Sequence, residues 1–191
     1  FKLDIRDARI LMELDQLYKR LNRPHADRLD LLDKLKEVAF SRDDLYLEYV
    51  TLLNQLGRYE EAIHMIDARR FHPWEGGEGK VPAQYQLARV ELVKACLKAG
   101  ENEKALFLIE ECFIYPYNLG EGKLYGAQEN DFNYYKACAL QALGREAEAR
   151  ELFLAASTGN SQPAAAMYYN DQKPDKIFYQ GLAFRKLGRE D

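Results

Sequence analysis

Apolar residues recur at helical spacing along most of the chain. In the segment 43–56, for example, Leu45, Tyr49, Leu52 and Leu56 fall on one face of a helix. Windows of this kind predict helices at about 5–21, 25–39, 43–56, 59–70, 83–99, 102–114, 129–143, 146–157 and 175–187. Long connections are left at 71–82, 115–128 and 158–174. We therefore expect an all-α protein.

The predicted helices come in pairs joined by a recurrent turn. A glycine followed five residues later by alanine occurs in QLGRYEEA (55–62), KAGENEKA (98–105) and ALGREAEA (142–149), and KLGRED (186–191) begins a fourth copy. The glycines are 43, 44 and 44 residues apart: Gly57, Gly100, Gly144 and Gly188. A weaker turn places Asn22 35 residues before the first of them. Each glycine is expected to end a helix in the left-handed conformation, which predicts repeated helical hairpins that must stack to cover their apolar faces.

This pattern resembles the tetratricopeptide repeat. The residues that carry the resemblance are Tyr46, Leu53, Gly57, Tyr59, Ala62 and Ile66, with Phe184 and Gly188 in the last copy. The resemblance implies a right-handed α-α superhelix of about four helix pairs with long inter-repeat loops. The family's unit is about 34 residues, whereas a period in the forties is also typical of HEAT and armadillo arrays. The glycine–alanine turn favours the tetratricopeptide interpretation.

We expect residues 1–191 to form a single array. Residues 1–41 would be an atypical first hairpin, 42–80, 81–124 and 125–174 the repeats, and 175–191 a truncated last repeat. The chain starts without methionine and ends inside a begun repeat, so we expect a fragment of a longer protein. The repeated loops and the stretch 168–189 resemble the C-terminal arm of large, uncharacterised bacterial proteins with an N-terminal mutarotase-like β-sandwich. That resemblance implies a cytoplasmic bacterial protein with a connection to carbohydrate.

Composition narrows the classes of function. A net charge of −4 and a pI near 5.5 argue against a general nucleic-acid-binding role. The sequence contains no apolar run of the roughly 18–20 residues that span a bilayer. The cysteines fall in three different predicted helices, at Cys96, Cys112 and Cys138, and do not suggest a disulfide framework.

Two of the long connections contain the same motif. FHPWEGGEGKV (71–81) aligns with IYPYNLGEGKL (114–124) at an offset of 43 residues, the same as that of the hairpins. A phosphate-binding P-loop requires G-x-x-x-x-G-K-[ST]. The first glycine is replaced by Trp74 and Tyr117, and the final hydroxyl by Val81 and Leu124. The P-loop interpretation therefore fails.

These GEGK loops, as we call the two connections 71–82 and 115–128, have two interpretations. They can be plain connectors, in which glycine permits turns and proline prevents the preceding helix from continuing. Alternatively, they lie side by side and present a polar and aromatic strip that docks another domain or binds a sugar or peptide. The residues of that strip are Trp74, Glu78, Lys80, Tyr117, Glu121 and Lys123.

Signals for chemistry are weak elsewhere in the chain. The histidines His25, His64 and His72 match no metal-binding or catalytic motif, so we expect no enzyme, no metal site and no cofactor. A carboxylate pair of Glu78 with Glu121 would be separated by one repeat step of roughly 10 Å, near the upper limit for a glycosidase. A second candidate groove, on the concave helix face, contains Arg89, Lys94 and Tyr134.

The sequence therefore predicts a non-catalytic scaffold for protein–protein or interdomain interaction. Its partner would be its own missing N-terminal domain, a second subunit or a peptide, with no nucleic acid and no membrane. A carbohydrate-binding accessory module is the alternative. A third possibility is an active site completed by a missing domain, in which Glu78 would take part.

Overall fold

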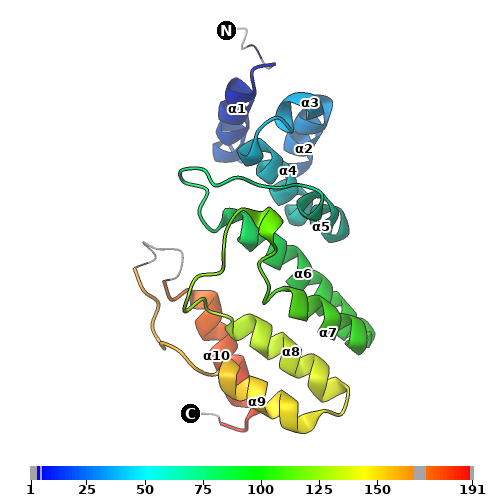
Figure 1. The fold of residues 1–191 in the computed structure, drawn as a ribbon, viewed down its shortest axis with the longest axis vertical. Helices are drawn as coiled ribbons and strands as arrows, with labels where there is room; N and C mark the ends of the chain where they lie inside the picture. The colour runs from blue at the N-terminus through cyan, green and yellow to red at the C-terminus, as the bar shows by residue number, and fades with distance from the viewer. Residues whose placement is uncertain (1–3, 5, 166–170, 190–191) are drawn as a thin grey trace. The chain divides into compact units, whose positions relative to one another are not determined.

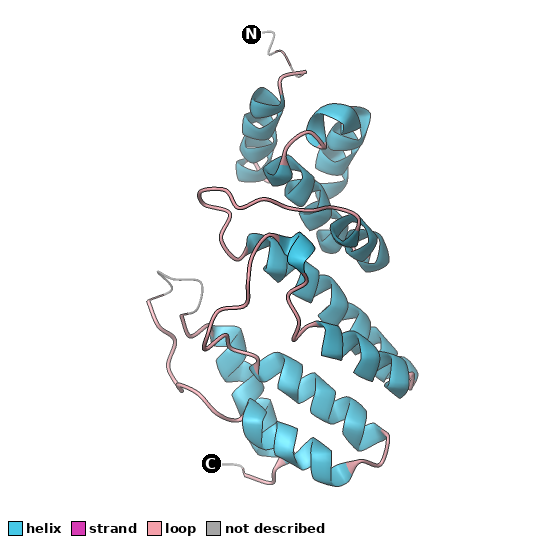
Figure 2. Ribbon diagram, viewed as in Figure 1, coloured by secondary structure: helices cyan, strands magenta, loops and turns pink. Residues whose placement is uncertain are grey.

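A computed structural model describes residue 4, residues 6–165 and residues 171–189 of the chain. Within these residues the secondary structure is helical and contains no strand (Figures 1 and 2). This confirms the predicted all-α class. The helices are α1 (Ala8–Arg20), α2 (His25–Lys34), α3 (Lys36–Ala39), α4 (Asp43–Gln55), α5 (Tyr59–Asp67), α6 (Lys80–Ala99), α7 (Asn102–Glu111), the 3-10 helix η1 (Tyr117–Leu119), α8 (Asn130–Ala142), α9 (Glu146–Ala156) and α10 (Pro174–Lys186).

Three helices differ from the prediction by three residues at the start or in continuity. Helix α1 begins at Ala8, later than the predicted residue 5. The helix expected at 25–39 is interrupted at Leu35, whose φ of −116° and ψ of 31° separate α2 from α3. Helix α6 begins at Lys80, earlier than expected, and so includes Pro82 in its first turn. Proline is tolerated there because the amide groups of the first turn have no intrahelical partner.

The predicted glycine turns are confirmed. At Gly57, φ is +75°, and the N–H groups of Gly57 and Arg58 donate to the carbonyls of Asn54 and Leu53 at 3.1 and 2.9 Å. These are the two hydrogen bonds of a Schellman motif. The three later glycines have φ between +72° and +78° and the same pair of hydrogen bonds. Asn22 takes the corresponding place at the end of α1, with φ +52°.

The described chain divides into two units by its internal contacts. The first contains the residues up to Ala88 together with Tyr117–Glu121, and the second contains Arg89–Pro116 and the residues from Gly122 onward. The division passes through α6, and a short piece of the second GEGK loop belongs to the first unit.

In the first unit, α4 packs against α2, α3 and α5. Its apolar residues are almost all buried, and Ala62, the alanine predicted to allow close approach of α5, is also fully buried. Aromatic rings close one end of this core, with Phe40, Tyr46 and Phe71 in edge or tilted contacts at 4.7 and 5.8 Å between centroids. Phe71 thus ties the start of the first GEGK loop to the core.

In the second unit, α8 packs against α7, α9 and α10. One cluster contains Val93 of α6 with Ala105 and Ile109 of α7, and another contains Ala149 and Phe153 of α9. The alanines that follow the glycine turns are again buried. The hairpin pattern predicted from the sequence is therefore present in both units.

A buried ionic cluster joins three helices of the first unit. The guanidinium of Arg28 in α2 donates to both carboxylate oxygens of Asp15 in α1, at 2.9 and 2.7 Å, and to Glu48 in α4 at 3.0 Å. Asp15 is 0% and Arg28 2% exposed. Lys19 completes the cluster with a 2.9 Å ion pair to Glu48. Burial acts to raise the pKa of Glu48, but its hydrogen bonds and charged neighbours outweigh that effect and hold the pKa below its ordinary value.

We expect the first unit to lose stability in acid. Desolvation acts to raise the pKa values of Glu48, Asp43 and Asp44 in the folded chain. Hydrogen bonds and nearby cations outweigh this effect, so all three pKa values are lowered. A carboxylate with a depressed folded pKa contributes stability above its unfolded pKa, and this is lost as pH falls through the folded pKa. The urea midpoint followed by Trp74 fluorescence should therefore hold steady above the ordinary glutamate value of 4.5 and fall below it. Glu48→Gln should flatten this dependence, and an unchanged slope in that variant would contradict the assignment.

Candidate functional site

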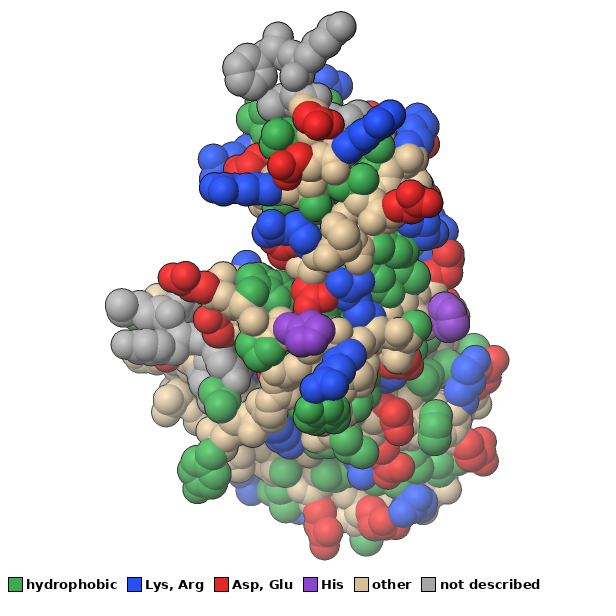
Figure 3. Space-filling model, turned by 45° about the horizontal axis from the view of Figure 1, so that its top comes forward, with side chains coloured by type: hydrophobic (Ala, Val, Ile, Leu, Met, Phe, Trp, Pro, Cys, Tyr) green, Lys and Arg blue, Asp and Glu red, His purple; other side chains and the backbone are tan. Residues whose placement is uncertain are grey.

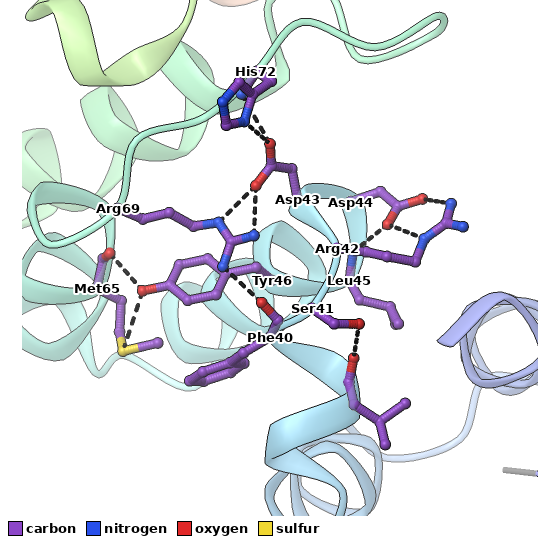
Figure 4. A network of polar contacts seen from close by, with 11 residues as sticks. Phe40, Ser41, Arg42, Asp43, Asp44, Leu45, Tyr46, Met65, Arg69 and His72 are labelled. Atoms are coloured by element: carbon purple, nitrogen blue, oxygen red, sulfur yellow. Dashed lines mark hydrogen bonds and ion pairs between the residues drawn. The ribbon is translucent and has the colours of Figure 1, made fainter. Parts of the chain in front are cut away.

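The first GEGK loop is fixed at its start by a polar network. The backbone N–H of His72 donates to the carboxylate of Asp43, at the start of α4, at 2.8 Å. The other oxygen of Asp43 accepts from Arg69 at 2.6 Å, and Arg69 also donates to the carbonyl of Phe40 at 2.9 Å. Figure 4 shows the guanidinium of Arg69 between these two acceptors and over the ring of Tyr46, with a distance of 4.3 Å to the ring centroid. The start of the loop is therefore held to α4 by charge-assisted bonds.

A segment of the second GEGK loop packs on the first. The carbonyl of Asn118, in η1, accepts from the backbone N–H of Phe71 at 2.8 Å. The side-chain amide of Asn118 donates to the carbonyls of Ile66 and Arg69 at 2.9 and 3.1 Å, so it satisfies carbonyls at the end of α5. Next to it, Arg70 donates to the hydroxyl of Tyr117 at 2.6 Å.

Gly120 and Glu121 complete this packing. Gly120 has φ +75°, and a Cβ at this position would lie 2.6 Å from the carbonyl oxygen of Phe71, so only glycine fits without displacement. The carboxylate of Glu121 accepts from the backbone N–H of Gly79 at 2.7 Å. Gly79 is the residue before α6, and its carbonyl accepts the first helical hydrogen bond, from Ala83. Glu121 therefore caps α6 from the other loop, at the positive end of the helix dipole.

The packed loops enclose a pocket of about 290 Å³ within the first unit. Its lining residues come from the first loop, the start of α6 and the docked segment: His72, Pro73, Trp74, Glu75, Gly77, Glu78, Val81, Leu119 and Glu121. Trp74 is half-buried, and its indole lies so close to Gly77 that a Cβ there would be 2.3 Å from the ring. We call this site the loop pocket. It combines one indole with three carboxylates.

The structure places the predicted strip residues in different surroundings. Trp74, Glu78 and Glu121 line the loop pocket. Tyr117 is exposed on the docked segment and pairs with Arg70, as described above, while Lys80 is exposed in the first turn of α6. Lys123 belongs to the second unit, where it forms an ion pair with Glu129 and donates to the carbonyl of Phe113 at 3.3 Å.

The two copies of the motif thus have different conformations. In the first copy, GEGK leads directly into α6, whereas in the second copy residues 124–129 separate it from α8. The sequence signal that could have shown this is a pair of adjacent positions among those where the copies differ. Asn118 and Leu119 replace Glu75 and Gly76. Asn118 makes hydrogen bonds to the first loop and to the end of α5, and Leu119 is buried, so these two differences explain how the second copy packs on the first.

The predicted concave-face residues contribute mainly to the interior of the second unit. Arg89 is 5% exposed. Tyr134 is half-buried in an aromatic cluster with Tyr135 and Tyr179, and burial raises its pKa to about 12. Lys94 is exposed and forms an ion pair with Glu91 at 2.6 Å. These three residues do not form one accessible strip.

The described residues contain neither a metal site nor a membrane-spanning helix. No group of three or more His, Cys, Asp and Glu residues in that part of the chain is arranged to hold a metal ion. None of its helices is both long and apolar enough to cross a membrane. On the face drawn in Figure 3, acidic and basic side chains are interspersed.

Comparisons with known proteins do not assign the chain. No protein-family model matches it, and no solved structure matches it significantly. The loop pocket is therefore interpreted from its own geometry.

Proposed function

We propose that the chain is a non-catalytic helical-repeat scaffold that docks a protein partner through the loop pocket. In this proposal the helical hairpins of each unit are tetratricopeptide-like repeats. The observation that carries the proposal is the docking of Tyr117–Glu121 onto the first GEGK loop. Joining two helices does not require a second loop that caps α6 and lines a pocket, so this packing favours a binding role over that of a plain connector.

The pocket is suited to binding because its walls are fixed before any partner arrives. Asp43 holds the start of the first loop, Asn118 holds the end of α5, and Glu121 holds the start of α6. Within the described part of the chain, the carboxylates of Glu75 and Glu78 take part in no hydrogen bond or ion pair. A preorganised surface with unused polar groups binds with a smaller loss of conformational entropy.

Site-specific photo-crosslinking tests this proposal. Glu78, which is exposed at the pocket, would be replaced by the photoreactive residue benzoylphenylalanine in the cell that makes the protein. We expect an adduct whose mass-spectrometric map identifies one protein, either a second copy or a different chain. Adding Trp74→Ala should remove most of this adduct, because the indole forms part of the binding wall.

Two controls keep this test specific. The same photoreactive residue at Glu60, exposed in the first turn of α5, should not give the adduct. Tyr125→Ala, which removes a fully exposed aromatic residue of the second unit, should leave the adduct at 78 unchanged. Equal yields of the adduct from the photoreactive residue at positions 78 and 60, or no adduct from position 78, would contradict docking through the pocket.

Carbohydrate binding is a second candidate function, favoured by the half-buried indole beside carboxylates in the pocket. Aromatic faces and carboxylates are the groups that bind sugar rings and hydroxyls. Trp74 is the single tryptophan of the chain, so its fluorescence should respond to a panel of neutral oligosaccharides if this function is correct. No response across the panel, with the photo-adduct present, would leave protein docking as the function.

A further inference from the structure

We propose that the loop pocket receives an arginine side chain of the protein partner. This inference rests on the proposed docking function and specifies the chemistry of the residue that the partner inserts. It is carried by the combination of a cavity, an indole and carboxylates that are not neutralised.

The charge of the pocket is acidic. Glu75, Glu78 and Glu121 all line it, and no lysine or arginine among the described residues does. Glu121 uses one oxygen for the N–H of Gly79 and thereby offsets the positive end of α6. The one basic side chain at the wall is His72, and its ring lies 3.1 Å from Asp43, which also binds Arg69. A cation is therefore the charge that this pocket complements.

The basic residues closest in sequence to Glu75 and Glu78 do not pair with these carboxylates. Arg70 donates to Tyr117 and stacks on its ring at 4.8 Å from the centroid. Lys80 follows Gly79 in the first turn of α6 but does not line the pocket. No cation of the described chain therefore pairs with Glu75 or Glu78, and both carboxylates face solvent.

The indole of Trp74 favours a guanidinium over other cations. Tryptophan is the best aromatic partner for a cation, and a planar guanidinium can stack on a ring while its N–H groups reach carboxylates. A carboxylate can accept two parallel hydrogen bonds from arginine, whereas lysine offers a single point charge. The volume of about 290 Å³ lies near the lower end of the roughly 300–1,000 Å³ of ligand sites. This size suits one long side chain better than an oligosaccharide.

A fluorescence titration with matched peptides tests the proposal directly. The full chain would be titrated with acetyl-Gly-Arg-Gly-amide and with the peptide in which citrulline replaces arginine. Citrulline has nearly the same shape but no charge. We expect a saturable change in Trp74 emission with the arginine peptide and at least tenfold weaker binding of the citrulline peptide. The same peptide with lysine in place of arginine should bind more weakly than the arginine peptide. Added salt should weaken the binding of the arginine peptide, because the loop pocket is accessible to ions that screen its charges.

Variants locate the binding site. Glu78→Gln and Glu75→Gln preserve side-chain size and remove a negative charge, and neither residue contributes to the capping contacts. Each should weaken the arginine peptide several-fold, and the double variant should abolish saturation. Glu60→Gln is the matched control, with a similar exposed glutamate outside the pocket, and it should behave as the unmodified chain.

Equal binding of the arginine and citrulline peptides, or no saturable response to either, would overturn the arginine inference. A response to neutral sugars that exceeds the response to arginine would do the same. The titration uses no partner protein, so its result is independent of the photo-crosslinking. A partner adduct at position 78 without an arginine response would keep the docking function and remove only this occupant.

Discussion

Arg28→Met is expected to lower the free energy of unfolding of the first unit by about 3–5 kcal/mol. The substitution removes the cation that pairs with Asp15 through two hydrogen bonds and with Glu48 through a third. Asp15 is completely buried and would keep an unpaired charge or bind a proton, and both outcomes disfavour the folded state. Urea unfolding followed by Trp74 emission measures the change, since Trp74 belongs to the same unit.

A double variant separates the loss of the pair from the loss of packing. Asp15→Leu combined with Arg28→Met removes both buried charges, and should recover most of the lost stability, because an apolar replacement of a buried pair is often neutral. The exposed pair of Lys34 and Asp30, at 2.5 Å and 69% and 62% exposed, is the control. Lys34→Met should change stability by less than about 1 kcal/mol. If Lys34→Met and Arg28→Met had equal effects, the cluster would not have the stabilising role assigned to it.

Gly120→Ala is expected to destabilise the first unit by about 2–4 kcal/mol, from left-handed backbone strain and a steric clash. The φ of +75° disfavours any Cβ, and the added carbon would meet the carbonyl of Phe71 at 2.6 Å. We expect the docked segment to move away from the first loop, which would remove Glu121 from the N–H of Gly79. The urea midpoint and the wavelength of Trp74 emission should both change.

Gly122→Ala is the matched control, because it changes the next glycine of the same GEGK sequence. No atom lies within 4 Å of a Cβ at Gly122, and its φ is outside the left-handed region. Alanine there should be neutral or should stabilise by about 0.4–1 kcal/mol through the unfolded state. Similar losses in the two variants would show that the packing of Gly120 on Phe71 is not what holds the segment.

The sequence by itself determined the local structure well. Helical periodicity and the repeated glycine turn located the helices to within a few residues at most ends, because these signals depend on neighbouring positions. The weaker turn predicted at Asn22 is also present, and there asparagine adopts the left-handed conformation that it tolerates. The interruption at Leu35 and the early start of α6 were not predicted.

The buried ionic cluster could not be predicted from the sequence. Asp15, Arg28 and Glu48 lie on three different helices, and each is a residue type that is normally exposed. Only the packing of α1, α2 and α4 brings their charges together and removes them from water. The sequence contains the charges but carries no local signal of their pairing.

The candidate site was predicted in part. Three residues of the proposed strip, Trp74, Glu78 and Glu121, line the same pocket. The two GEGK sequences are identical, but the structure gives them different conformations. Gly79 precedes a helix, whereas Gly122 lies in a loop, and only the first copy receives a capping carboxylate, that of Glu121 from the second copy. The sequence determined the helices and their turns through local interactions; the loop pocket was decided by hydrogen bonds between segments about 40 residues apart, which only the tertiary structure brings together.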